Sequence, residues 1–234
     1  MADITLHILK PSVNNLSARV FVRAAGLDFE EIDVWGNQSS EEFIAMNPSK
    51  LTPTMEEAGL PRGAMWESCA IMAYLCNKHG LDQFYPTDPA KRATVDNAMF
   101  YIIGSVYPLL ARSTYGSLGF PGYPGEVLVA DVDDSVKAAA ASESSAALAT
   151  SLEAFRTAFL ADGKFVGGAD TPTIADIRIV ASAEFLHIVD YPFPGWLTDY
   201  MGAVESALGD AYSEPAADVR GFLDYVRSQA AATS

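Results

Sequence analysis

The pattern of apolar and polar positions divides the chain into two halves, and the first half alternates strands with helices. The apolar runs "ITLHIL" (4–9) and "DFEEIDV" (28–34) predict two strands. Between them, Leu16, Val20 and Ala24 share one face of a helix, which Gly26 ends. The chain therefore opens β-α-β, and this order implies parallel pairing of the two strands.

A short helix and a hairpin continue this half. In "SSEEFIAMNP" (39–48) two serines precede a pair of glutamates, so a helix is expected to start there and to end before its proline. Residues 51–66 predict strand, tight turn and strand, and a helix follows from about Ser68 to His79. The expected order of the first half is β-α-β-α-β-β-α.

The second half predicts helices. Residues 88–112 and those from 143 onward have helical periodicity, and "AAAASESSAALA" (138–149) is dominated by strong helix formers. The short run "FVGG" (165–168) alone suggests a strand here. Residues 113–137 are rich in Gly, Pro and aromatic side chains, which favours a long surface excursion. We expect an α/β domain at residues 1–82 and an all-α domain at 90–234.

Composition restricts the classes of partner. The 234 residues are 50% hydrophobic and 19% charged, as in globular proteins. The formal net charge of −15 argues against nucleic acid and against anionic membranes as partners. No apolar run reaches about 18 residues, so no membrane span is expected. No basic segment precedes an apolar stretch near Met1, so no signal peptide is expected.

The sequence contains two cysteines, Cys69 and Cys76, and both fall in the helix after the hairpin. Seven helical residues separate their Cα atoms by about 10 Å along the axis. That distance is too long for a disulfide. A reduced protein and a cytoplasmic localisation are therefore expected.

Three motifs, in this order, carry a family resemblance: "FIAMNPSKLTP" (43–53), "WESCAI" (66–71) and "TPTIADIRI" (171–179). Together they resemble the cytosolic glutathione transferases, in particular non-tyrosine classes such as theta, phi and beta. The resemblance implies a thioredoxin-like N-terminal domain, an all-helical C-terminal domain, a homodimer, a role in detoxification and no metal. In the last motif, Thr173 and Asp176 have the spacing of a helix capping box, which serves folding.

The resemblance also implies a glutathione site at the hairpin. Pro53 resembles the family's cis-proline, which turns the Thr52 backbone N–H and C=O toward a peptide ligand. The helix start at Ser68 can bind a carboxylate, and Glu67 can accept from an ammonium group. Glutathione carries both groups on its γ-glutamyl end. The alternative is that Pro53 starts an edge strand and Ser68 caps a helix.

One position departs from the family pattern. A Gln or Lys that helps to hold the glycyl carboxylate in some members is replaced by Leu51. Lys50 and Gln38 are nearby candidates for this role. An anionic tripeptide needs some local positive charge in a protein with a net charge of −15.

The group that would stabilise the thiolate is expected between the first strand and the first helix. Some classes of the family use a tyrosine within the strand, but Ile8 occupies that position. Counting back from "ARVFVRAAG" gives Asn14, whereas counting forward from the strand gives Ser12. Ser17 lies one helical turn further on and could cap the helix. Asn14 is preferred because the count from the helix crosses no loop. Each of the three could also be an ordinary turn or cap residue.

Aromatic side chains could receive a second substrate. Tyr107, Tyr115 and Phe120, with Tyr101, fall near the expected mouth of the site, although core or loop packing would also explain them. The expected function is transfer of the glutathione thiolate to a hydrophobic electrophilic small molecule. The alternatives are a glutathione-dependent dehalogenase or isomerase and a non-catalytic interaction module with the transferase fold.

A thiol redox protein that uses Cys69 is a third function. The sequence disfavours it, because Cys69 falls inside a buried helix and has no CxxC partner.

Overall fold

The computed structural model describes residues 3–120, 133–161 and 163–232. Its first half contains the predicted elements in the predicted order. They are β1 (Ile4–Ile8), α1 (Val13–Ala24), β2 (Phe29–Asp33), α2 (Glu41–Met46), β3 (Thr54–Glu57), β4 (Ala64–Trp66) and α3 (Ser68–His79). The four strands form one mixed sheet in the order β2-β1-β3-β4, with β1 parallel to β2 and antiparallel to β3. This is a thioredoxin-like domain.

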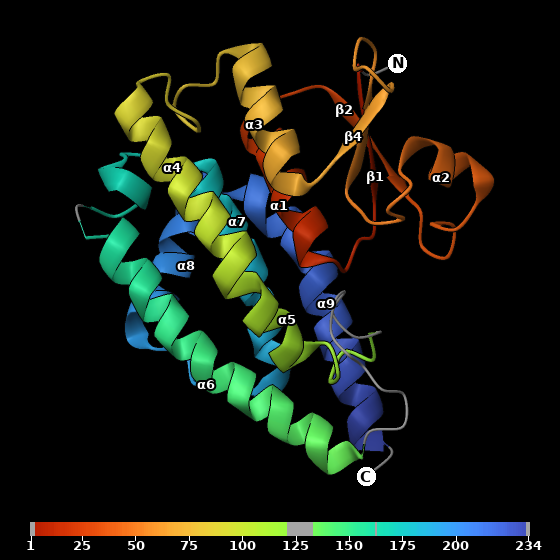
Figure 1. The fold of residues 1–234 in the computed structure, drawn as a ribbon, viewed down its shortest axis with the longest axis vertical. Coiled ribbons are helices and arrows are strands. Elements are labelled where there is room, and N and C mark those ends of the chain that lie inside the picture. The colour runs from red at the N-terminus through yellow and green to blue at the C-terminus, as the bar shows by residue number, and fades with distance from the viewer. Residues whose placement is uncertain (1–2, 121–132, 162, 233–234) are drawn as a thin grey trace.

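Apolar positions hold the layers of this domain together. Leu6 and Ile8 of β1, Leu16 of α1, Met55 of β3 and Ile71 of α3 are all fully buried. In Figure 1, α1 and α3 lie on one side of the sheet and α2 on the other. The apolar runs that predicted the strands and helices are therefore used to pack the sheet against helices.

The second half is helical in the described residues. Its elements are α4 (Pro89–Tyr101), a π-helical turn η1 (Ile102–Val106), α5 (Tyr107–Thr114), α6 (Asp134–Phe159), a 3₁₀ turn η2 (Val166–Gly168), α7 (Ile174–Ala183), a 3₁₀ turn η3 (Glu184–Val189), α8 (Gly195–Leu208) and α9 (Asp210–Ala232). Every residue of α7 is buried, and α7 packs against α1 of the first domain. Across the described ranges, no helix combines the length and the apolarity needed to cross a membrane.

Two sequence expectations in this half were wrong in part. The run "FVGG" forms a 3₁₀ turn, because Gly167 and Gly168 adopt positive φ angles of 69° that end an extended chain. The excursion predicted at 113–137 is shorter at both ends, since α5 continues to Thr114 and α6 already begins at Asp134. Residues 121–132 of that segment lie outside the described residues. The domain boundary between residues 82 and 90 stays a prediction.

The predicted capping box fixes the start of α7. The Thr173 backbone N–H donates to Asp176 Oδ2 at 2.7 Å, and the reciprocal contact is also present. Asp176 Oδ1 accepts from the Val166 N–H and from the Tyr200 hydroxyl. Burial raises the pKa of this carboxyl, and its hydrogen bonds oppose that rise. The box therefore anchors the start of α7, and Arg178 follows two residues after Asp176.

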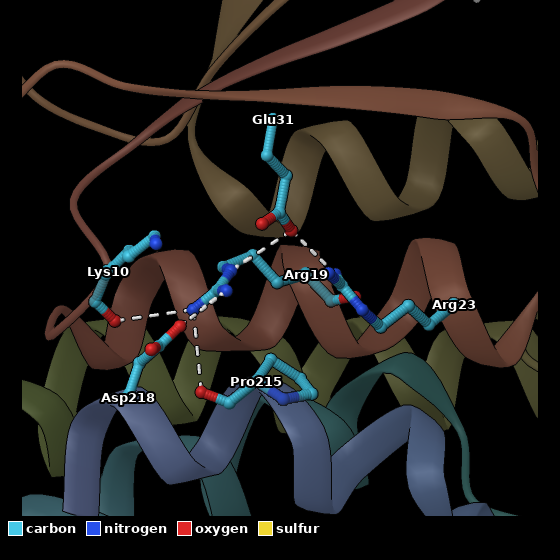
Figure 2. A network of polar contacts seen from close by, with 6 residues as sticks. All are labelled: Lys10, Arg19, Arg23, Glu31, Pro215 and Asp218. Atoms are coloured by element: carbon cyan, nitrogen blue, oxygen red, sulfur yellow. Dashed lines mark hydrogen bonds and ion pairs between the residues drawn. The ribbon is translucent and has the colours of Figure 1, made fainter. Parts of the chain in front are cut away.

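A buried ion-pair network joins the two halves of the chain (Figure 2). Arg19 of α1 bonds Glu31 Oε1 of β2 at 3.1 Å and Asp218 Oδ2 of α9 at 2.8 Å. Arg23 also bonds Glu31 Oε1, at 2.6 Å. The remaining N–H groups of Arg19 reach the backbone carbonyls of Lys10 and Pro215. Helix α9 is thus held against the first domain by a cation with carboxylates on both sides.

Candidate functional site

A cavity of about 860 Å³ lies between the hairpin side of the first domain and the elements η1, α5 and α7 of the second. It is lined by twelve of the fourteen candidate site residues that the sequence singled out, all but Ser17 and Tyr101. These are Ser12, Asn14, Gln38, Lys50, Leu51, Thr52, Pro53, Glu67, Ser68, Tyr107, Tyr115 and Phe120. Residues far apart in the sequence therefore meet at one site.

The Thr52–Pro53 peptide bond is cis, as the resemblance implied. Asn15 Nδ2 of α1 donates to Thr52 Oγ1 at 2.9 Å and so fixes this corner against the first helix. Within the described part of the chain, nothing donates to the Thr52 C=O or accepts from its N–H. Both backbone groups can therefore pair with an extended ligand in the cavity.

The other end of the hairpin presents the start of α3. Glu67 is the residue before the helix and has a φ of 74°, in a region that non-glycine residues rarely adopt. Such a conformation costs on the order of 1–3 kcal/mol and is concentrated at functional sites. Ser68 is buried at the first helical position, whereas the Glu67 side chain is exposed. The helix amides and both side chains can thus receive a zwitterionic group.

Two side chains supply the local positive charge that an anionic tripeptide would need. Lys50 and Arg178 are the cationic residues among those lining the cavity. Lys50 has a φ of 59°, and the neighbouring Leu51 is half exposed and contributes apolar surface to the rim. Gln38 lines the same rim. Lys50 and Gln38 therefore remain the candidates for a second carboxylate.

Ser12 occupies the position just before the first residue of α1. Its side chain makes no capping hydrogen bond, although its backbone carbonyl accepts from the Leu16 N–H at 2.8 Å. A serine at this position normally caps its helix with its hydroxyl. In this protein Ser12 lines the cavity instead, beside the positive end of the helix dipole.

The Asn14 side chain is held by two hydrogen bonds to the helical domain. Its Nδ2 donates to the Tyr107 hydroxyl at 2.8 Å, and its Oδ1 accepts from Arg178 Nη2 at 2.6 Å. Tyr107 shares a further hydrogen bond of 2.8 Å with the Tyr115 hydroxyl. Asn14 therefore links α1 to α5 and α7, and one of its amide N–H groups is already used.

The third candidate for the thiolate donor, Ser17, does not line the cavity. Helix α1 begins at Val13, so Ser17 lies in its second turn and does not cap it. Its hydroxyl donates to the Asn14 carbonyl, and its side chain is fully buried outside the cavity. The misplacement arose because the helix starts about one turn earlier than its apolar periodicity indicated.

Arg178 is the site residue that sequence reasoning missed. It is only 3% exposed, lines the cavity, and stacks over the Tyr107 ring with 4.6 Å between its guanidinium carbon and the ring centroid. A signal was present in the sequence: an arginine stands in the otherwise apolar run after the capping box. Charged residues are rarely buried without a partner, so this position warranted attention.

An aromatic wall closes the helical side of the cavity. Tyr115 packs edge-on against Phe120, and Phe120 stacks on Phe222 of α9 at 5.7 Å. The π-helical turn η1 adds Ile103 and Gly104 to the lining, and such turns often occur at functional sites. Tyr101 does not reach the cavity, because its hydroxyl donates to the Ser151 carbonyl.

The cysteines do not form a disulfide with each other. Cys76 is buried, and burial raises the pKa of its thiol to about 12. Burial also raises the pKa of the Cys69 thiol, while the nearby Arg178 cation opposes that rise. Because thiol reactivity requires the thiolate, these environments argue against a redox role for either residue.

Residues 2–77 match the family model of the glutathione S-transferase N-terminal domain. A delta-class glutathione transferase of Nilaparvata lugens is 26% identical, with a TM-score of 0.75, over 95% of this chain and 99% of that chain. An epsilon-class enzyme of the housefly is 27% identical, with a TM-score of 0.73, over 96% and 97% of the two chains.

The first domain thus matches the glutathione S-transferase N-terminal domain, and nearly the whole chain is similar to solved glutathione transferases. Human glutathione transferase theta-2, solved in complex with glutathione, shares the fold at 21% identity, with a TM-score of 0.78 over 97% of this chain and 91% of that chain. The similar structures thus include enzymes of the delta, epsilon and theta classes.

Proposed function

We propose that the protein is a glutathione transferase that joins the glutathione thiolate to a hydrophobic electrophile. The observation that carries this proposal is the single cavity in which the Thr52 backbone edge and the start of α3 face an aromatic wall. The first two features suit a peptide with a zwitterionic end. The third suits an apolar second substrate, and the human theta-2 relative was solved with glutathione.

Each part of glutathione has a partner in this proposal. The Thr52 N–H and C=O pair with the cysteinyl residue of the tripeptide. Ser68 and the amides of α3 bind the γ-glutamyl carboxylate, and Glu67 accepts from its ammonium group. Lys50 and Gln38 face the glycyl carboxylate at the rim.

Ser12 is the donor to the thiolate that the contacts favour over Asn14. The Asn14 amide is held by Tyr107 and Arg178, whereas the Ser12 hydroxyl caps no helix amide and lines the cavity. A free thiol titrates near 8.5, and lowering its pKa by about 2 units requires about 2.7 kcal/mol. One hydrogen bond to a charged group supplies about 1.5–3 kcal/mol, and a helix N-terminus adds up to about 2 kcal/mol. Ser12 at the start of α1 combines both contributions.

The pKa of the thiol of bound glutathione distinguishes Ser12 from Asn14 as the donor. Ser12→Ala should raise this pKa by about 1–2 units, since one hydrogen bond to an anion is lost. Asn14→Ala should shift this pKa less, because the Asn14 side chain is bonded to Tyr107 and Arg178 and affects the thiol only through them. Thiolate absorbance near 240 nm, followed against pH in both variants, measures the shifts. The opposite ranking would restore Asn14 as the donor.

Binding of glutathione tests the proposal itself. Calorimetry and thermal shift should detect glutathione but not small thiols that lack the γ-glutamyl group, and an activated aryl halide should then be conjugated. Ser68→Ala should weaken binding by about 1–3 kcal/mol, because a charged partner loses a donor. Ser17→Ala is the matched control, since Ser17 lies outside the cavity. A folded protein that binds no glutathione would instead support a non-catalytic interaction module.

A homodimer forms part of the proposal. Phe100 on α4 is 70% exposed, and Ile103 lies beside it on η1 with 38% exposed. Two-fold assembly is the commonest oligomeric state and would cover these apolar side chains. Light scattering at micromolar concentration should give twice the chain mass, and Phe100→Glu should reduce it. A single 25.0 kDa species in the unmodified protein would contradict the dimer.

A further inference from the structure

Arg178 is a buried cation without a carboxylate partner among the described residues. Its Nη2 donates to Asn14 Oδ1, and its Nη1 donates to the Ser182 hydroxyl, so both acceptors are neutral. Its Nε has no hydrogen-bond partner within the described residues, although it is buried. A charge in this state is costly, because desolvation is not offset by an opposite charge.

The surroundings of Arg178 limit where a compensating anion can lie. The rest of α7 is packed inside the core, and the Tyr107 ring covers one face of the guanidinium. The side chain also lines the cavity. An anion can therefore approach Arg178 from the cavity without unfolding any packed element.

We propose that Arg178 supplies the counter-charge that keeps the glutathione thiol ionised, an inference that rests on the proposed function. Its partner Asn14 lies two residues after Ser12 in α1, so the cation is held beside the start of the first helix. The two carboxylates of glutathione have separate partners on the hairpin side of the cavity. The thiolate is the remaining negative charge of the ligand.

The Arg178 charge favours the ionised form of a neighbouring thiol, that of Cys69. Burial raises the pKa of the Cys69 thiol, and the Arg178 charge lowers it, as an opposite charge should. Within the described ranges, the other ionisable side chains along the cavity are Lys50, Glu67, Tyr107 and Tyr115. Lys50 and Glu67 are exposed and opposite in sign, so solvent screens them and their effects oppose each other. Arg178 therefore dominates the charge at the buried end.

The proposed role makes a measurable difference to the bound thiol. An opposite charge within about 4–6 Å lowers the pKa of an acid by about 1–3 units. The thiol proton leaves to water. Arg178 thus acts by its field, and Asn14 and Tyr107 position its guanidinium.

Three variants test this role: Arg178→Met, which removes the charge at similar volume, Arg178→Gln, which is neutral but polar, and Arg178→Lys, which keeps the charge. The thiolate absorbance of bound glutathione is titrated in each. The neutral variants should raise the pKa of the bound thiol by about 1 unit or more, so the thiolate fraction below that pKa falls about tenfold. Arg178→Lys should recover much of the shift. Affinity for S-methylglutathione, which has no ionisable thiol, should stay within about twofold.

The outcomes separate this inference from the proposed function. If the unmodified protein binds glutathione with a lowered thiol pKa, and folded Arg178→Gln leaves that pKa unchanged, the role of Arg178 is overturned while the transferase function stands. An equal loss of S-methylglutathione affinity would mean that Arg178 holds a carboxylate, which also overturns it. If the unmodified protein binds no glutathione, both proposals fail together.

Discussion

Two arginines are buried to the same extent, but one has carboxylate partners and the other has only neutral partners among the described residues. Arg19 at the domain interface and Arg178 at the cavity are each 3% exposed. Arg19 has carboxylates from β2 and α9, with Arg23 sharing the first of them, as Figure 2 shows. Arg178 has neutral partners and an Nε without an acceptor within the described residues.

The difference separates a structural charge from a functional one. A paired buried cation fixes the geometry of the elements that supply its partners, and removing it leaves their charges unpaired. An unpaired buried cation stabilises nothing comparable in the chain itself. An unpaired buried cation is instead expected beside a ligand, on which its electrostatic field acts. Residues in such environments are concentrated at functional sites.

The largest expected effect is on the paired arginine. Arg19→Met should reduce the free energy of unfolding by about 3–5 kcal/mol, because Glu31 is left partly buried with one cation fewer and Asp218 loses its partner. Urea denaturation measures the change. A loss below about 1 kcal/mol would mean that the interface does not depend on this network.

The next largest effect is on the pH dependence of stability, through Glu31 of the same network. Burial raises the pKa of the Glu31 carboxyl, but hydrogen bonds from Arg23 and Arg19 outweigh it, so the folded pKa is lowered. A lowered folded pKa contributes stability above the unfolded value of about 4.5, and that stability is lost as the pH falls through the folded pKa.

Glu31→Gln should therefore lose about 1–3 kcal/mol at neutral pH and show a weaker decline below pH 4.5. Urea denaturation between pH 3 and 7 compares the two proteins. Parallel curves for the variant and the unmodified protein would assign the acid sensitivity to other carboxyls.

Arg178→Met should behave in the opposite way from Arg19→Met. Its free energy of unfolding should stay unchanged or rise by about 1 kcal/mol, since an uncompensated charge is replaced by an apolar side chain of similar size. The same urea measurements give the value. A destabilisation equal to that of Arg19→Met would break the comparison, because Arg178 would then be structural.

The smallest effect is expected at the exposed end of the network. The Asp218 side chain is 37% exposed, so water screens its pairing with Arg19. Asp218→Asn should lower the free energy of unfolding by less than about 1 kcal/mol. A loss as large as that of Glu31→Gln would show that α9, and not β2, supplies the main counter-charge.

Local patterns in the sequence determined most of the fold. The period of apolar positions predicted the β-α-β-α-β-β-α order, and the limits predicted for the helix at 68–79 agree with α3. The Thr173–Asp176 capping box was equally predictable, because both residues belong to one helical turn. The cis peptide at Thr52–Pro53 and the start of α3 were predictable through the family motifs, since one short hairpin connects them.

Only the tertiary structure decided how the buried end of the cavity is built. Periodicity sets the face of a helix but leaves its first residue open. The count that preferred Asn14 to Ser12 and Ser17 therefore lacked the helix start, which the structure places at Val13. The contact between Asn14 and Arg178 joins residues 164 positions apart. No local pattern encodes such a pair, because it exists only once α7 has packed against α1, and that packing is what brings an unpaired charge to the cavity.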